Sequence, residues 1–296
     1  MKLKISLFIC LALCGCSVST NDLKISVLSS SSINISKGEE VKLELEIKCD
    51  TPIQDPLSLS VKNSSNNFEE SITIRLNEKT SISSVLNFKP PQSGVYTVSI
   101  DGFRGDPNTN NNKKEIEIMV TQELAIITTQ YGDMVVDFFE DTAPQHVESF
   151  KLHAKTGYYN GTIFHRVIPG FVIQGGDPNT KGENKASYGM GGHAAKFFGV
   201  GNEKDSTTWN IPAEFNELKH KHGILSMARS SHPNSSGSQF FICAGDVSHL
   251  DGQYTVFGQV IEGTQVIDQI VNLPRDDKDI PHQRVEMNVR LEKRTI

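Results

Sequence analysis

Residues 164–178 read FHRVIPGFVIQGGDP, and this stretch carries most of the information about fold and chemistry. Two further motifs follow in the same half of the chain, GILSMAR at 223–229 and SGSQFFI at 236–242. LDGQYTVFG at 250–258 completes the set. Because these motifs occur together and in one order, they are far more specific than a single short pattern.

The motifs resemble those of the cyclophilins, and the resemblance extends over residues 124–293. It implies a barrel of eight antiparallel strands capped by two helices, a closed form that leaves no unpaired edge. It also implies a peptidyl-prolyl cis/trans isomerase that uses no cofactor and no metal. Its partners would be proline-containing polypeptides, whose folding it would assist.

The chemistry explains these residue types. Rotation about a peptide bond costs about 18–20 kcal/mol, yet the two forms before proline differ by only about 0.5–1 kcal/mol. An enzyme must therefore favour the twisted amide over both planar forms. By resemblance, Arg166 donates to the proline nitrogen as it becomes pyramidal, and Gln174 holds the substrate carbonyl. The other implied substrate-binding residues are Phe171, Val172, Ala228, Arg229, Gln239, Phe241, His249, Leu250 and Tyr254.

Some positions depart from the family pattern. Val172 stands where Met is usual, and Tyr254 where many members have His. His249 replaces a Trp that helps to bind cyclosporin, so we expect weak drug binding with activity retained. Arg229 replaces a common Asn, of which the family uses the backbone. Phe164, Phe240 and His165 are interpreted as structural, the two rings as core residues.

Other chemistries fit less well. The glycines at 189–192 and 199–201 lack the Lys-Ser/Thr of a phosphate-binding loop. His193, His220 and His222 have no Cys or acid at a ligand spacing, so we expect solvated loop histidines instead of a metal site. Two alternatives to the enzyme stay open: a module that docks proline segments with incidental turnover, and a scaffold for a functional N-terminal domain.

The rest of the second domain, residues 123–296, mixes strands and two helices. A hairpin is predicted for 125–129 and 134–138 around Tyr131-Gly132-Asp133, and a final strand for 285–291. Residues 141–144, DTAP, predict a helix start with a capping side chain and Pro in the first turn. This helix would bury Val147, Phe150, Leu152 and Ala154 and end at Gly157, and a second helix would span 263–273.

Residues 23–120 alternate between apolar and polar side chains. Strict period two at 41–47, 71–76 and 95–100 indicates half-buried strands. Turn signals separate them, a long loop is expected at 105–112, and a last strand at 115–120. The pattern favours an antiparallel, immunoglobulin-like β-sandwich that acts as a spacer or binding module.

The first residues form a leader. A positive start and a short apolar run at 1–15 are typical of a secretory signal and too short to span a bilayer. Leu13-Cys14-Gly15-Cys16 resembles the lipobox of bacterial lipoproteins, which implies lipidation of Cys16 and a tether over 16–22. We therefore expect a lipid-anchored envelope protein that faces the periplasm or the exterior.

Composition is consistent with two soluble domains. Hydrophobic residues make up 37% and charged residues 22%, and a net charge of -6 gives no basic footprint for nucleic acid. Beyond the expected leader and Cys16, only Cys49 and Cys243 remain. They lie in different domains, so we expect buried small hydrophobes and no disulfide.

Overall fold

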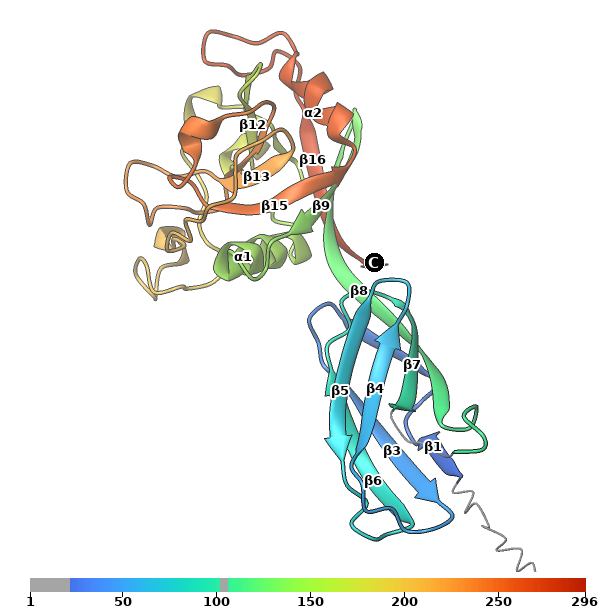
Figure 1. Ribbon diagram of the computed structural model, residues 1–296. Coiled ribbons are helices and arrows are strands. Elements are labelled where there is room, and N and C mark those ends of the chain that lie inside the picture. The colour runs from blue at the N-terminus through green and yellow to red at the C-terminus, as the bar shows by residue number, and fades with distance from the viewer. Residues whose placement is uncertain (1–21, 102–105) are drawn as a thin grey trace, which may run out of the picture. The chain divides into compact units, whose positions relative to one another are not determined.

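The structure, a computed structural model, describes residues 22–101 and 106–296 (Figure 1). The expected leader, the lipidation site Cys16 and the start of the loop at 105–112 lie outside the described residues. The chain divides into two compact units. The N-terminal unit ends at Thr121 and includes Thr295 and Ile296, and the C-terminal unit is Gln122–Arg294.

The N-terminal unit is made of strands. β1, β3 and β6 form a three-stranded sheet, and β5, β4, β7 and β8 follow one another in a second sheet, with β2 parallel to β8. Leu43 of β3, Leu59 of β4 and Val98 of β7 are buried in one apolar cluster, so both sheets contribute to this core. The strands are β1 (Leu23–Val27), β2 (Ser32–Ser36), β3 (Val41–Cys49), β4 (Leu57–Asn63), β5 (Phe68–Ile74), β6 (Ser81–Phe88), β7 (Gly94–Asp101) and β8 (Lys113–Thr129).

Two predicted strand boundaries in this unit are wrong. The strand expected at 71–76 is β5, Phe68–Ile74, because the turn before it closes at Asn67 with a positive φ of 55°. The strands expected at 115–120 and 125–129 are one strand, β8, which pairs with β7 over its first part and with β9 over its last. No Pro or Gly lies between them to interrupt the strand.

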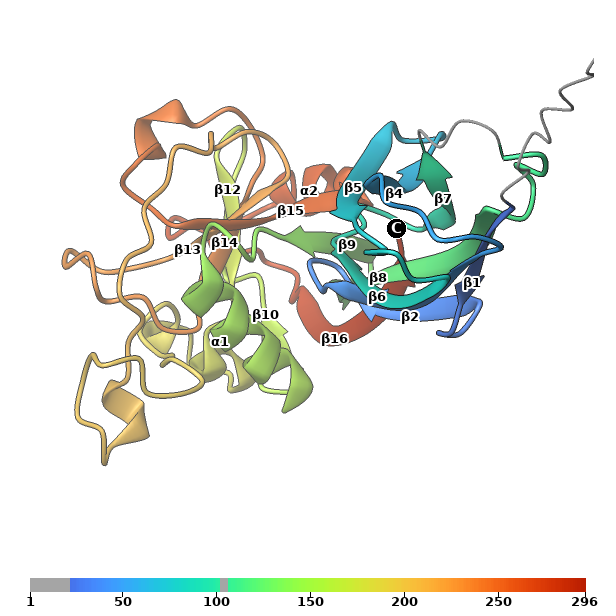
Figure 2. The same cartoon turned by 60° about the horizontal axis from the view of Figure 1, so that its bottom comes forward.

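The C-terminal unit is mainly β with two α-helices, as the sequence predicted. Its strands pair in the order β11-β12-β14-β13-β15-β9-β8, and β16 pairs with both β8 and β10. Figure 2 shows α1 and α2 beside these strands. The strands are β9 (Gly132–Phe138), β10 (Thr162–Ile163), β11 (Arg166–Ile168), β12 (Val172–Gly175), β13 (Ile224–Met227), β14 (Phe240–Cys243), β15 (Val256–Glu262) and β16 (Glu286–Thr295). The helices are α1 (Pro144–Lys155) and α2 (Thr264–Val271), with short 3-10 turns η1 (Pro178–Lys181), η2 (Lys185–Ser187), η3 (Ser206–Thr208) and η4 (Ser248–Leu250).

Several local predictions are confirmed. The hairpin of β8 and β9 turns at Thr129 and Gly132, which lie opposite each other. Phe164 and Phe240 are fully buried core rings. Cys49 and Cys243 are buried and unpaired, and burial raises the pKa of Cys243 to about 12.

The start and the buried face of α1 differ from expectation. Pro144 occupies the first turn, but Ala143 stands at the cap position and no side chain before the helix caps it. Leu152 is only half-buried, whereas His146 and His153 are buried on the inner face. Burial lowers the pKa of His153 to about 4, so this ring is neutral at neutral pH.

Candidate active site

Four neighbouring strands of the C-terminal unit carry a row of side chains on one face. Arg166 of β11 lies opposite Gln174 of β12, which lies opposite Phe241 of β14. Phe241 lies opposite Ser226 of β13. Directly opposed residues in a sheet share a face, so these four side chains stand in one row.

Their neighbours in sequence point the other way. Val167, Ile173 and Leu225 belong to the main apolar core, together with Phe240 and Ile242. Successive side chains alternate between the two faces of a strand. The same short motifs therefore supply the core from one face and the candidate site from the other.

A tight turn between β11 and β12 sets the position of Phe171. Pro169 is followed by Gly170 with φ 71°, and the amide of Phe171 donates to Ile168 O at 2.9 Å. Pro followed by a residue with positive φ is the signature of a type II turn. The Phe171 ring lies nearly parallel to His249, with 5.6 Å between ring centroids and 17° between planes.

One pocket collects most of the residues that the sequence singled out. Its lining residues are Arg166, Phe171, Val172, Gln174, Ala228, Arg229, Phe241, Leu250 and Tyr254. Gln239 lines an adjoining pocket, together with Gln174, Ala228 and Arg229. His249 is not among the residues that line either pocket, but its ring stacks on that of Phe171, which does line the first one.

The deep wall of the pocket is apolar. Val172, Phe241 and Leu250 are 2%, 4% and 8% exposed and belong to one small cluster. Tyr254 presents its ring edge-on to Phe241, at 5.7 Å between centroids and 80° between planes. A wall this well packed is preformed, so a small apolar ring can enter without rearranging it.

The opposite side of the pocket is polar and held by a chain of amides. Gln174 Nε2 donates to Gln239 Oε1 at 3.0 Å, and Gln239 Nε2 donates to Gly191 O at 2.7 Å. Gln239 O also accepts from the Ala228 amide at 2.9 Å. These bonds fix the Gln174 amide so that Oε1 lies 3.5 Å from Arg166 Nη1.

Arg166 is half-buried at the pocket rim. Its guanidinium carbon lies 5.8 Å from the centre of the Phe171 ring. Within residues 22–101 and 106–296, no carboxylate forms an ion pair with it. Most of its hydrogen-bonding capacity therefore remains available to a ligand.

A buried polar group behind Phe241 was not predicted. His220 was expected to be a solvated loop residue, but it is 1% exposed and its ring lies parallel to Phe241. Its Nδ1 lies 3.0 Å from Asp251 Oδ1, and its Nε2 lies 3.1 Å from Ser226 Oγ. Burial lowers the pKa of His220, and the backbone and side-chain N–H groups of His220 lower the pKa of Asp251 to about 2.

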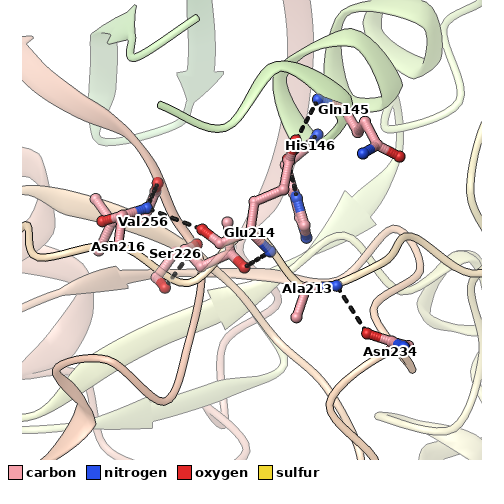
Figure 3. A network of polar contacts seen from close by, with 9 residues as sticks. Gln145, His146, Ala213, Glu214, Asn216, Ser226, Asn234 and Val256 are labelled. Carbon is pink, nitrogen blue, oxygen red and sulfur yellow. Dashed lines mark hydrogen bonds and ion pairs between the residues drawn. The ribbon is translucent and has the colours of Figure 1, made fainter. Parts of the chain in front are cut away.

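The polar network continues from Ser226 to the start of α1 (Figure 3). Ser226 Oγ donates to Thr255 O at 2.9 Å, and Thr255 Oγ1 accepts from the Glu214 amide at 3.1 Å. The Glu214 carboxylate accepts from the amides of Gln145 and His146, each at 3.0 Å, and contacts His146 Nδ1 at 2.6 Å. Burial alone would raise the pKa of Glu214, but these hydrogen bonds hold it below its ordinary value.

Metal-ligating groups do not gather elsewhere in the part of the chain that the structure describes. That part contains no cluster of three or more His, Cys, Asp or Glu side chains able to hold a metal ion. His193 and His220, considered together in the sequence, have separate partners: His193 Nδ1 contacts Ala194 O, and His220 contacts Asp251.

Comparison with known proteins extends the resemblance. Residues 124–291 match the family model described as cyclophilin type peptidyl-prolyl cis-trans isomerase/CLD. Peptidyl-prolyl cis-trans isomerase-like 3 of Dictyostelium discoideum is 44% identical over 154 residues, 52% of this chain and 84% of that protein. The Helicobacter pylori peptidyl-prolyl cis-trans isomerase is 40% identical over 171 residues, 56% of this chain and 90% of that protein.

A solved structure is also similar. The Cryptosporidium parvum cyclophilin type peptidyl-prolyl cis-trans isomerase, crystallised in the presence of the dipeptide Ala-Pro, is 34% identical in sequence. The match covers 57% of this chain and 98% of that one, with a TM-score of 0.49.

The C-terminal unit is mainly β, and the Arg166 guanidinium and the Gln174 amide border its apolar pocket. The family match covers more than half of the chain, and the two relatives are matched over most of their length. The chain belongs to the cyclophilin type peptidyl-prolyl cis-trans isomerase family, and its activity is that of a peptidyl-prolyl cis-trans isomerase.

Proposed function

We propose that the pocket binds the proline ring of a polypeptide client and that Arg166 is its catalytic residue. The observation that carries this proposal is the open guanidinium at the rim of an apolar pocket, without a carboxylate partner among the described residues. As the peptide bond twists, the proline nitrogen loses resonance and gains a lone pair. A hydrogen bond from Arg166 to that lone pair exists only in the twisted state, so it lowers the barrier without tightening ground-state binding.

The other residues orient the substrate. Val172, Phe241 and Leu250 are suited to the proline ring because they form the buried apolar wall. Gln174 is suited to the carbonyl before proline, since its amide is already aligned by Gln239. Val172 stands where a longer Met is usual in the family, so we expect a roomier pocket floor. His249, in place of Trp, supports the expectation of weak cyclosporin binding.

Exchange between cis and trans forms of a proline peptide tests this assignment. Arg166→Ala is expected to lower kcat/KM about a hundredfold or more, the usual cost of removing a donor that acts only in the transition state. Arg166→Lys keeps the charge but not the planar fork, so it should restore only part of the rate. Arg290→Ala, an exposed arginine on β16, is the matched control and should keep full activity.

Two results would overturn the proposal. The first is a rate for Arg166→Ala equal to that of the unmodified protein. The second is a folded protein that binds the peptide without accelerating exchange, which would instead favour a proline-docking module. Circular dichroism of each variant separates loss of chemistry from loss of fold.

The architecture of both units is consistent with finer assignments. In the C-terminal unit the strand path runs from β11 to β10, which are separated only by Phe164 and His165. Counting β10 and β11 as one interrupted strand gives eight strands, the number in the barrel that the resemblance implies. Amide hydrogen exchange at residues 162–168 would test whether the barrel is closed. In a closed barrel the amides of both β10 and β11 are paired and should exchange slowly.

An immunoglobulin-like sandwich is the corresponding proposal for the N-terminal unit. Its sheets, β1-β3-β6 and β8-β7-β4-β5, match the A-B-E and G-F-C-C′ orders of that fold. Tyr96 is fully buried and its hydroxyl donates to Gln92 O at 2.6 Å, which resembles the tyrosine corner of such domains. Tyr96→Phe should therefore destabilise this unit by about 1 kcal/mol, measured by urea unfolding; an unchanged midpoint would count against the assignment.

We also propose that the protein is lipid-anchored through Cys16 to a membrane of the cell envelope, where it acts on exported proteins. The lipobox-like end of the leader supports this location. In the described residues no helix has the length and hydrophobicity needed to cross a membrane.

A further inference from the structure

The side chain of Arg229 lies at the pocket, although sequence reasoning used only its backbone. Its guanidinium carbon is 4.6 Å from the centre of the Tyr254 ring and 5.8 Å from that of Phe215. Arg229 is a lining residue of both the proline pocket and the adjoining pocket. A planar cation in contact with two aromatic rings is held in place before any ligand arrives.

The hydrogen bonds of this guanidinium leave its charge uncompensated. Nε donates to Gln253 O at 3.0 Å, and Nη1 donates to Ser230 O at 2.9 Å and Ser231 O at 3.3 Å. These carbonyls are neutral acceptors, and they occupy three of the five N–H donors. Across the described residues Nη2 has no hydrogen-bond partner, and no Asp or Glu forms an ion pair with Arg229.

Two unpaired guanidinium groups therefore line one pocket, those of Arg166 and Arg229. In a chain with 35 acidic and 29 basic residues, the other four arginines of the C-terminal unit each form an ion pair with Asp or Glu. Lys196, Arg275 and Arg294, for example, are each paired with Glu or Asp. The pocket is thus a local positive site on an acidic chain.

We propose that Arg229 selects clients with a carboxylate side chain next to the proline. A free N–H group of Nη2 can donate to a carboxylate oxygen, and the contacts with the rings of Tyr254 and Phe215 hold the guanidinium at the pocket. This substrate preference rests on the proposed role of the pocket as the proline site. Asp or Glu beside proline is the favoured class, and Lys or Arg there is disfavoured by like charge.

The test measures kcat/KM for two matched peptide series in low salt. In one series the residue just before proline is Glu, Gln or Lys, and in the other the residue just after proline is varied in the same way. In at least one series, Glu should exceed Gln by about three- to tenfold, and Lys should fall below Gln. The Glu/Gln ratio should approach one in about 1 M salt, where the Debye length is only about 3 Å.

Variants assign the preference to one side chain. Arg229→Gln should bring the Glu/Gln ratio to about one, and Arg229→Glu should invert it in favour of Lys. Each ratio is internal to one variant, so a general loss of activity does not obscure it. Arg290→Gln removes the same charge from exposed β16 and should keep the ratio of the unmodified protein.

The outcomes separate this inference from the proposed function. If all peptides are isomerised at rates independent of charge in both series, the carboxylate preference is wrong and the function stands. If the preference persists in Arg229→Gln, another cation such as Arg166 is responsible and the assignment to Arg229 is wrong. If the unmodified protein accelerates none of the peptides, the proposed function itself fails.

Discussion

At the scale of single residues, Phe241 depends on a polar group that never touches the pocket. His220 lies 6.0 Å from Phe241 between ring centroids, with 20° between planes. Asp251 holds this ring by its carboxylate and follows Leu250, another pocket residue. The amide of His220 also donates to Asp251 Oδ1, at 2.9 Å. Asp251 therefore holds the His220 ring that packs on Phe241, and it does so from the position next to Leu250.

Asp251→Asn should make the free energy of unfolding depend less on pH in the acid range. The folded-state pKa of Asp251 is lowered to about 2 from an ordinary 3.8, so its ionised form stabilises the fold above about pH 4. That contribution is lost as the pH falls from about 4 toward 2. The variant should have a lower urea midpoint at pH 6 and a smaller further decrease at pH 3 than the unmodified protein.

Asp268→Asn is the matched control for this measurement. Asp268 pairs with His222 at 2.9 Å, but its side chain is 58% exposed, so little stability depends on it. Its variant should reproduce the unmodified acid dependence. An Asp251→Asn protein with the unmodified profile would show that the carboxylate contributes nothing to this wall.

Among the secondary-structure elements, α1 is capped at its start by a carboxylate from a loop that is distant in sequence. Glu214 is 69 residues beyond Gln145 and 68 beyond His146, yet its two oxygens accept both amides at the helix start. A negative charge at this end also complements the helix dipole. The loop at Glu214 is tied in turn to Thr255 at the start of β15. One side chain thus links a helix, a loop and a strand.

Glu214→Ala should destabilise the protein by about 1–3 kcal/mol, because it leaves buried amides without acceptors. Urea unfolding measures this free energy, and amide exchange should show faster opening at Gln145 and His146. Glu148→Ala is the control on the same helix, since Glu148 is exposed and pairs with exposed Lys196. Equal destabilisation by the two variants would contradict the capping role of Glu214.

The difference between local motifs and long-range contacts explains which features could be predicted from the sequence. Arg166, Gln174 and Phe241 could be predicted to belong together because short motifs carry them and strand alternation aligns them in one row. The cap of α1 and the burial of His220 could not be predicted. Both depend on carboxylates far along the chain, Glu214 and Asp251, and local patterns of apolar residues contain no signal for such pairs.

At the scale of the whole molecule, two units with separate cores share one strand in the chain. β8 pairs with β7 in the N-terminal unit and with β9 in the C-terminal unit. The sequence predicted two strands here because its apolar pattern weakens around Thr121-Gln122-Glu123. The weaker apolar pattern marks the point where the strand passes from one hydrophobic core to the other. Because no Pro or Gly interrupts the chain there, the strand continues. The proposed chemistry is confined to the C-terminal unit, because every residue that lines the pocket lies there.

We expect the whole chain to be held at a membrane by lipid attached to Cys16. Each buried CH₂ group contributes about 0.8 kcal/mol to membrane binding, so several acyl chains on Cys16 would hold the whole chain at a bilayer. Cells fed a labelled fatty acid should transfer the label to the unmodified protein and to Cys14→Ser, whose altered residue lies in the leader. Cys16→Ser should carry no label.

A chain that starts at Ser17 should be recovered in the soluble fraction with its isomerase activity intact, because no proposed site residue precedes Arg166. Label on Cys16→Ser, or membrane retention of the shortened chain in high salt, would mean that the attachment has another origin.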